Sequence, residues 1–227
     1  MRAGTYQLML ISMCISGKIY ADGNPFQVYD NNLMLGYNNT IYDSGNSSGG
    51  FNLQGEALLD VGIWLSGTAG YMLYYNRSSS VLNKVTGANL GISAGYAFPV
   101  ANNRINLIPY ATAQHIGQSL STGYDMSQVD YIDGYGVGFI SEYDVIQKTL
   151  KLRLNLGVMA QNTKTSYVSP ENYPDTSSQN SLWVINPSIQ WNITKIITSQ
   201  FSYGYSINSV NSNLNANVFN IAVGIVY

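Results

Sequence analysis

Charge is the first thing that this sequence has little of. Asp, Glu, Lys and Arg make up 10% of the 227 residues, whereas a soluble domain carries about 25%. The formal net charge is -2, and no cluster of Lys and Arg occurs along the chain, which argues against nucleic acid as a partner. Apolar residues stand at an ordinary 45%, so the polar character comes from uncharged Asn, Ser, Thr, Gln and Gly.

Cysteine is nearly absent as well, because Cys14 is the single one. It lies in MRAGTYQLMLISMCISGKIYA, where Arg2, a short apolar run and a final small residue are typical of a secretory signal peptide. The apolar run is too short to span a bilayer as a helix. We therefore expect a signal peptide at 1–21 and a mature domain at 22–227 without disulfides or cysteine chemistry. An N-terminal anchor or buried helix is the alternative, whereas Met13 before the cysteine fits a lipoprotein signal poorly.

Helical periodicity is also missing, and almost every segment alternates between apolar and polar residues. In FNLQGEALLDVGIWL the odd positions from Phe51 to Leu65 are apolar and most even positions are polar. Most of these segments exceed ten residues, whereas soluble strands run about five or six and a tilted membrane-spanning strand needs about nine to eleven. The predicted strands are 31–43, 51–65, 69–77, 88–100, 104–118, 131–146, 149–163, 181–193, 197–209 and 214–227.

The connections between these segments alternate in length. Four are tight: Ser66-Gly67-Thr68, Asn102-Asn103, Gln147-Lys148 and Thr194-Lys195. Longer polar segments such as STGYDMSQVD lie between them. Short turns at one end and long loops at the other are typical of outer-membrane barrels. We predict an all-β fold, a transmembrane antiparallel up-and-down β-barrel of ten strands with eight as the fallback, and both termini on the periplasmic side.

The polar face distinguishes a membrane barrel from a soluble barrel, which alternates too. In water that face would carry many Lys and Glu residues. Here it is small and uncharged over long stretches, as in Gly91, Ser93 and Gly95, or in Asn186 and Ser188. Small residues fit the crowded lumen of a narrow barrel, so we expect the apolar face to point outward.

The few inward charges are predicted to form pairs. A two-residue turn at Gln147-Lys148 places Asp144 opposite Lys151 and Glu142 opposite Arg153, all on one face. Lone charges are costly in a lumen of low dielectric constant, so pairing is required. The network is predicted to include three more charges, Glu56, Asp60 and Arg104. A structural polar plug is the favoured interpretation, and a gated or ion-selective constriction is the alternative.

Aromatic residues lie near the ends of the predicted strands, on the apolar face. Such positions are typical of the two interfacial girdles of a membrane barrel. Stacking of a carbohydrate or another ligand is the alternative role. The predicted girdle residues are Trp183, Trp191, Tyr203, Tyr205, Tyr96 and Phe98.

The last twelve residues, ANVFNIAVGIVY, alternate up to a terminal aromatic residue. The alternating positions are Phe219, Ile221, Val223, Ile225 and Tyr227. With the signal peptide and the repeated amphipathic strands, this ending resembles the small bacterial outer-membrane β-barrel proteins, the OmpA/OmpX/Opa-like superfamily. The resemblance implies a Gram-negative outer membrane with its lipid and lipopolysaccharide, and recognition of the last strand by the barrel-assembly machinery. That strand is then expected to pair with the first, near NNLMLGYNN.

Residues for catalysis or metal binding are scarce. His115 is the single histidine, and Ser119, four residues along the same strand, is about 13 Å away, too far for a dyad. The Asp-x-His of barrel proteases does not occur. Asp125, Asp130 and Asp133 could hold Ca²⁺ loosely, although solvated loop residues are the simpler interpretation. We predict no enzyme activity, no cofactor and no metal.

The sequence therefore favours an integral outer-membrane protein with a mostly filled polar lumen and a structural or surface-interaction role, such as adhesion. Segment 164–180, rich in Tyr and Pro, is the candidate contact surface for host or other surface ligands. The alternatives are a small porin-like channel for small solutes, a lipid-modifying enzyme centred on His115, and a soluble secreted barrel.

Overall fold

The computed structural model describes residues 31–45, 47–75, 84–101, 104–122, 126–168 and 174–227. The predicted signal peptide, Cys14 and the Asn102-Asn103 turn lie outside the described residues. No helix within the described residues is long and apolar enough to cross a membrane. The elements are β1 (Asn32–Tyr42), β2 (Ser47–Leu58), β3 (Ile63–Tyr75), β4 (Lys84–Tyr96), β5 (Phe98–Val100), β6 (Ile105–Thr122), β7 (Met126–Ile146), β8 (Leu150–Val168), β9 (Thr176–Asn192), β10 (Ile197–Asn208), a 3-10 turn η2 (Ser212–Leu214) and β11 (Ala216–Val226).

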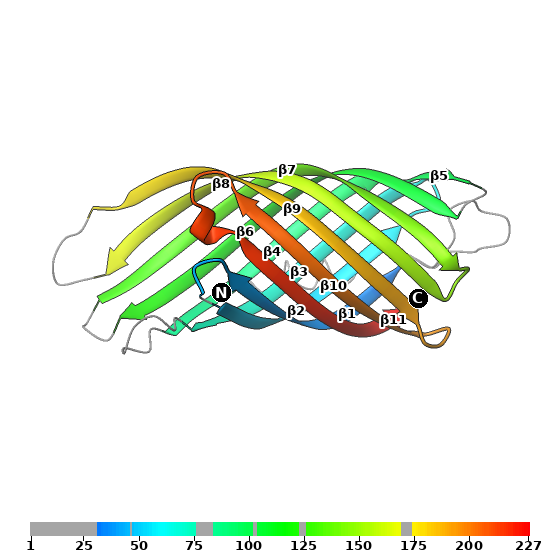
Figure 1. Ribbon diagram of the computed structural model, residues 1–227, viewed down its shortest axis with the longest axis horizontal. Helices are drawn as coiled ribbons and strands as arrows, with labels where there is room; N and C mark the ends of the chain where they lie inside the picture. The colour runs from blue at the N-terminus through cyan, green and yellow to red at the C-terminus, as the bar shows by residue number, and fades with distance from the viewer. Residues whose placement is uncertain (1–30, 46, 76–83, 102–103, 123–125, 169–173) are drawn as a thin grey trace, which may run out of the picture.

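These strands form a closed antiparallel barrel of ten strands, which confirms the preferred strand number. Each strand pairs with the next along the chain, and the short β5 continues β4 along β6. The ring closes where β1 pairs with β11, from Asn32 opposite Val226 to Tyr42 opposite Ala216 (Figure 1). Pairing of the first strand with the last was expected from the apolar ending, and it satisfies the backbone groups of both strands.

One end of the barrel carries the start of β1, the end of β11 and the short connections, and we call it the turn end. There the backbone N–H of Tyr227 donates to the carbonyl of Asn31 over 3.2 Å. The opposite end, where β1 meets β2 and β8 meets β9, is called the loop end. In Figure 1 the turn end lies to the right and the loop end to the left.

The predicted turn at Ser66-Gly67-Thr68 is wrong. The chain turns at 59–62, where Leu59 N donates to Ile63 O over 2.8 Å and Gly62 N donates to Leu59 O over 2.8 Å. Gly62 has φ of +84°, a conformation that a residue without Cβ adopts freely. The turn holds an even number of residues, so odd positions face outward on both sides of it. The alternation therefore continues through the turn and hides it in the sequence.

The hairpin between β7 and β8 differs from the predicted two-residue turn but keeps its register. Three residues connect the strands, with Lys148 at φ of +67°, and an irregularity between Asp144 and Ile146 shifts the pairing by one. The two differences cancel. Glu142 lies opposite Arg153 and Asp144 lies opposite Lys151, as predicted.

The barrel is much taller on one side. Strands β6, β7, β8 and β9 have 18, 21, 19 and 17 residues, whereas β1, β2, β10 and β11 have 11 or 12. The prediction that 164–180 is a loop is therefore wrong, because β8 continues to Val168 and β9 begins at Thr176. We call residues 113–122, 126–135, 160–168 and 176–181 the projecting wall (Figure 1).

The inner and outer faces of the barrel agree with the predicted alternation. Apolar side chains of alternate residues are exposed on the outside, among them Leu35, Val137, Leu154 and Ile221. Inside the turn end, a small apolar cluster is fully buried. Its members are Leu58, Trp64, Ala97, Ile108 and Ile140.

Candidate functional site

The strongest polar cluster of the described residues lies in the lumen near the turn end. Glu142 on β7 is 1% exposed, and Arg153 opposite it on β8 is 9% exposed. The Nε of Arg153 donates to Glu142 Oε1 over 2.8 Å, and its Nη2 contacts the same oxygen. The other carboxylate oxygen lies 3.6 Å from the Lys151 ammonium and accepts from Asn106 Nδ2 over 3.3 Å. The cluster thus supplies both oxygens of a buried carboxylate with donors.

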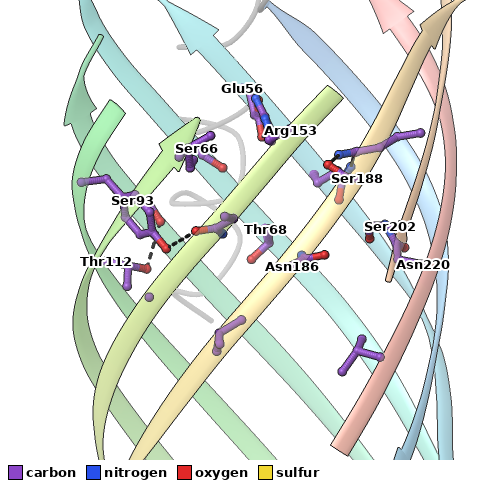
Figure 2. Close-up of a pocket in the computed structure, with 18 of the residues that line it drawn as sticks. Glu56, Ser66, Thr68, Ser93, Thr112, Arg153, Asn186, Ser188, Ser202 and Asn220 are labelled. Carbon is purple, nitrogen blue, oxygen red and sulfur yellow. Dashed lines mark hydrogen bonds and ion pairs between the residues drawn. The ribbon is translucent and has the colours of Figure 1, made fainter. Parts of the chain in front are cut away.

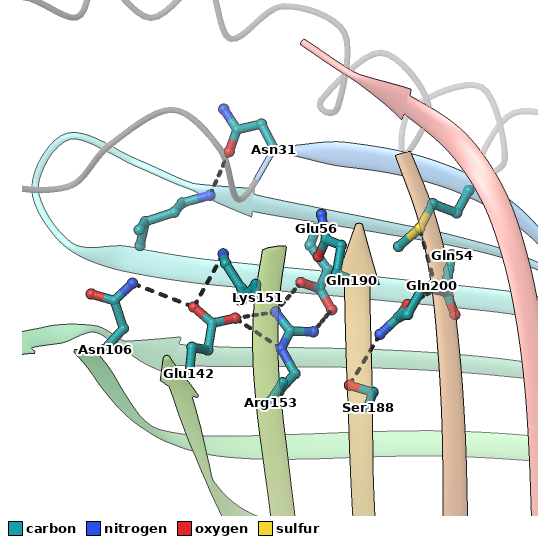
Figure 3. Close-up of polar contacts among 12 residues, drawn as sticks. Asn31, Gln54, Glu56, Asn106, Glu142, Lys151, Arg153, Ser188, Gln190 and Gln200 are labelled. Atoms are coloured by element: carbon teal, nitrogen blue, oxygen red, sulfur yellow. Dashed lines mark hydrogen bonds and ion pairs between the residues drawn. The ribbon is translucent and has the colours of Figure 1, made fainter. Parts of the chain in front are cut away.

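Arg153 also reaches the opposite wall of the barrel. Its Nη1 and Nη2 donate to Oε1 and Oε2 of Glu56, each over 2.6 Å. Such a bidentate pair fixes the orientation of both groups. Strands β8 and β2 lie half-way round the ring from each other, so this contact crosses the lumen (Figure 3). We call the group Glu56, Glu142 and Arg153 the crossbar.

A second bridge lies beside the crossbar. Gln54 Nε2 donates to Gln200 Oε1 over 2.6 Å, and Gln200 Nε2 donates to Ser188 Oγ over 3.4 Å (Figure 3). These side chains come from β2, β10 and β9. Together with the crossbar and the buried apolar cluster, they fill the lumen at the turn end.

Four of the seven predicted network residues lie outside the crossbar. Asp60 lies in the turn between β2 and β3 and Arg104 lies at the start of β6, and both are exposed. Their placement in the lumen was wrong, because both belong to connections rather than to strands. Asp144 lies opposite Lys151 as predicted, but the described ion pair of Lys151 is made with Glu142.

A cavity of about 360 Å³ lies directly above the crossbar. Uncharged polar side chains form most of its wall, including Asn52, Thr68, Asn186 and Asn220 (Figure 2). Inward side chains beside the crossbar are buried, whereas those further toward the loop end are partly exposed. The cavity is therefore closed toward the turn end and open toward the loop end.

Tyr110 shapes one side of this cavity. Its hydroxyl donates to Asn155 Oδ1 over 2.7 Å, and its ring packs against Trp64 with 5.8 Å between centroids. A Cβ at Gly138 would collide with the Tyr110 ring. The glycines on the inner face thus make room for large side chains of neighbouring strands.

The predicted girdle residues point outward. Trp183 and Trp191 are more than half exposed and lie eight residues apart on β9, about 26 Å along a strand. At a tilt of about 40° this separation is about 20 Å in height, close to the apolar band of outer-membrane barrels. Tyr96, Phe98 and Tyr203 are also exposed, and Tyr205 is partly exposed. Their role as a girdle stays a prediction.

The last strand has the predicted orientation. Its alternate apolar residues Phe219, Ile221, Val223 and Ile225 are exposed on the outer surface. The backbone of Tyr227 is bound to Asn31 beyond the last pair of the ladder. Recognition of this strand by the barrel-assembly machinery stays a prediction.

One pair of residues was missed in the sequence. His115 on β6 lies opposite Asp133 on β7, and Nδ1 lies 2.7 Å from Asp133 Oδ1. Both are exposed on the outer face, at 54% and 40%, and the His115 ring stacks on Tyr131 at 6.2 Å between centroids. Ser119 lies four residues along β6, out of reach of the imidazole.

The proposed calcium cluster does not form from the described residues. Asp130 points inward, where Gln118 and Gln128 Nε2 and Thr165 Oγ1 donate to its carboxylate. Asp133 points to the outside, and Asp125 lies outside the described residues. Groups of three or more potential metal ligands do not occur in the described part of the chain.

Comparison with solved structures identifies the type of barrel. The translocator domain of the autotransporter NalP from Neisseria meningitidis matches with a TM-score of 0.52 at 9% identity, covering 98% of this chain and 94% of that domain. The fold is that of a bacterial outer-membrane β-barrel. Other outer-membrane barrels match with lower scores. Ail of Yersinia pestis has a TM-score of 0.40 at 13% identity and covers 86% of this chain and 97% of its own, and the Escherichia coli protease OmpT has 0.44 at 8%, covering 86% and 92%.

No protein-family model and no curated protein sequence matches this outer-membrane-type barrel. Because the identities to solved structures are so low, the likeness establishes the fold and leaves activity to the site itself.

Proposed function

We propose that this protein is a non-enzymatic, integral barrel of a Gram-negative outer membrane, which acts as a structural or surface-interaction protein through its loop end. The observation that carries the proposal is the crossbar. Arg153 links the wall at Glu142 to the opposite wall at Glu56, and we infer that this link leaves solutes no open path along the lumen. The projecting wall then remains as the part of the molecule that reaches furthest from the membrane, and it replaces segment 164–180 as the contact surface.

Electrical recording in a planar bilayer tests the closed lumen. The purified protein, inserted into the bilayer, is expected to show no steady open conductance. Persistent open steps in the unmodified protein would contradict the proposal. A folded state is verified in the same preparation by heat-modifiable migration on a gel.

The location in the membrane follows from the outer apolar band and the predicted signal peptide. We expect lipid and lipopolysaccharide around the exposed apolar residues, with the loop end outside the cell. Cell fractionation should recover the protein with outer membranes. Recovery in a soluble fraction would overturn this part of the proposal.

Assembly through the last strand has its own test. Replacing Tyr227 with Asp places a charge at the end of the apolar row of β11, so the amount of assembled barrel in outer membranes should fall several-fold. The matched control is Asn220→Ser on the inward face of the same strand, which should assemble normally. Normal assembly of the Tyr227→Asp protein would remove this residue from the proposed assembly signal.

A small channel is the second candidate function. The cavity of about 360 Å³ above the crossbar favours it, because only side chains close the lumen beneath it. Steady conductance that changes in Glu142→Gln or Arg153→Gln would support the channel, and a silent bilayer would exclude it.

A lipid-modifying enzyme is the weakest candidate, and only the exposed His115–Asp133 pair favours it. We expect His115→Ala to leave lipid A and phospholipid profiles of the cells unchanged. An altered profile would contradict the non-enzymatic role.

A further inference from the structure

The step in height between β9 and β10 leaves a strand edge without a neighbour. The pairing of β10 with β9 ends at Asn208 opposite Leu182, whereas β9 begins at Thr176. Just beyond the ladder, Ser209 N donates to Ser181 O and Ser181 N donates to Ser209 Oγ, each over 2.9 Å. Within the described part of the chain, no strand pairs with 176–180 on this side.

The backbone of this edge is oriented for pairing. In an antiparallel strand the N–H and C=O of one residue point to the same side, and the side alternates along the strand. Ser181 directs both groups toward β10, so Gln179 and Ser177 direct theirs to the same side, where no described strand pairs with them. Both residues are exposed. The edge therefore offers two N–H donors and two C=O acceptors in register.

The end of β10 is fixed by specific contacts. The side-chain oxygen of Asn208 accepts from Val210 N and Asn211 N, each over 3.0 Å, and Asn208 N donates to Asn215 Oδ1 over 2.8 Å. The following turn is bonded to the connection after β1, where Asp43 N donates to Asn215 O over 2.9 Å. These bonds fix the turn against the connection after β1, and Val210 of the turn lines a cavity together with Gln179 of β9.

The described residues of this edge also lack the side chains that usually protect exposed strands. Natural edges are commonly blocked by Lys, Pro, bulges or a covering segment. Residues 176–180 read TSSQN and include no Lys, Arg or Pro. A cavity of about 380 Å³ on the outer surface adjoins the edge and is lined by Tyr135, Asn162, Gln179 and Val210. It has room for an outward-pointing side chain of an added strand.

We propose that the β9 edge at 176–180 binds an extended, basic peptide of a partner protein by strand addition. The charged residues near the edge favour a basic peptide, because two carboxylates, Asp133 on the outer face and Asp175 directly before β9, outnumber the ammonium group of Lys164, which lies opposite Ser177. Asp133 also lines the adjoining cavity. The inference rests on the proposed surface role and specifies how the partner is held.

A second copy of the same barrel does not fit this edge. Strands of outer-membrane barrels tilt by about 35–45° from the membrane normal. A twofold axis along that normal reverses the tilt in the neighbouring copy, so two β9 edges would cross at about 80° instead of lying side by side. A free peptide has no such constraint.

The test uses the full-length barrel in detergent micelles and a fluorescent ten-residue peptide of alternating Thr and Lys. Binding is measured by anisotropy for the unmodified barrel and for Gln179→Pro and Gln179→Ala. Proline removes one edge N–H without touching the ladder to β8, and alanine removes the side chain but keeps the N–H. We expect the alanine variant to bind like the unmodified barrel and the proline variant to bind about tenfold more weakly. The peptide N-methylated at alternate residues should not bind.

Each other outcome overturns the inference. Absence of binding at millimolar peptide, or equal binding to Gln179→Pro, excludes strand addition at this edge. Equal losses in both variants show recognition of the Gln179 side chain instead. Equal binding of a peptide with Glu in place of Lys removes the preference for a basic partner.

Amide hydrogen exchange of the unmodified barrel gives a second readout if the proline variant fails to fold. Gln179 and Ser177 amides should exchange rapidly, Ser178 and Asn180 slowly, and the first two should become protected when the peptide is added. Protection of all four without peptide would contradict the open edge. None of these results depends on whether the lumen conducts, so this inference and the closed barrel fail independently.

Discussion

The two ends of β7 show how differently the barrel treats a carboxylate. Glu142, near the turn end, is 1% exposed and is held by Arg153 and Lys151. Asp130, twelve residues earlier on the same inward face, is partly exposed and accepts bonds from Gln118, Gln128 and Thr165. A buried carboxylate requires a cation, because neutral donors do not compensate its lost hydration. At the loop end the carboxylate of Asp130 is partly exposed, so it keeps part of its hydration and needs no cation.

The outer face shows the same contrast. Toward the turn end and the middle of the barrel, exposed outward residues are apolar, such as Val223 and Leu152. On the projecting wall they include His115, Asp133 and Lys164. A wall that is polar on both faces is stable in water and unstable in hydrocarbon. We therefore expect the turn end to be embedded in the membrane and the projecting wall to stand in water.

Among the substitutions that test this contrast, Arg153→Met should lower the free energy of unfolding most. The change leaves Glu56, whose side chain is 12% exposed, without its bidentate partner and removes the main cation of the buried Glu142, at a cost of about 3–5 kcal/mol. Urea unfolding in lipid vesicles, followed by gel migration, measures the loss. The control at the other end is Asp130→Asn, which should change the free energy of unfolding by less than about 1 kcal/mol.

The crossbar has an internal control as well. Replacing both Glu56 and Glu142 with Gln in the Arg153→Met background removes the uncompensated charges and should restore most of the stability. Equal losses of unfolding free energy in Arg153→Met and Asp130→Asn would contradict the difference between the two ends.

A charge placed on the outer face should have a smaller effect that depends on height. Val223→Arg, in the apolar band of β11, should destabilise the barrel by about 2–4 kcal/mol, and Asn162→Arg on the projecting wall by about 0–1 kcal/mol. The same urea titration in vesicles compares them. Equal costs would mean that the projecting wall is also embedded in lipid.

The exposed His115–Asp133 pair should contribute least to the stability of the barrel. Its contact is 2.7 Å long but both side chains are well exposed, so Asp133→Asn should change the stability by about 0.2–1 kcal/mol. A loss of several kcal/mol would show that this part of the outer face is shielded from water.

Much of the structure toward the turn end could be predicted from the sequence alone. The pairing of Glu142 with Arg153 followed from one hairpin, because an error in turn length and an unforeseen bulge cancelled. The orientation of β11 and its pairing with β1 followed from strict alternation. Asp60 was misplaced because alternation continues through turns of even length, so the turn at 59–62 left no trace in the pattern. Arg104 was misplaced because β6 begins one residue later than the predicted strand, at Ile105.

The loop end was harder to predict for a physical reason. Above the membrane both faces of a strand meet water, so the apolar-polar alternation that marks a strand disappears, and β8 and β9 looked like a loop over 164–180. Two contacts could not be predicted because they join strands whose relative register does not follow from a single short hairpin. These were the reach of Arg153 to Glu56, 97 positions away, and the partnership of His115 with Asp133.

The most direct test of a barrel closed at one end is the reactivity of single cysteines along the inside of β9. Asn186→Cys, Ser188→Cys and Gln190→Cys are exposed to a membrane-impermeant maleimide on intact cells. Asn186 and Ser188 both line the cavity, but Ser188 and Gln190 are only 7% and 4% exposed, whereas Asn186 is partly exposed. We predict rapid labelling at 186, weak labelling at 188 and none at 190. Equal labelling at all three positions would mean an open lumen and would contradict a barrel closed at the turn end.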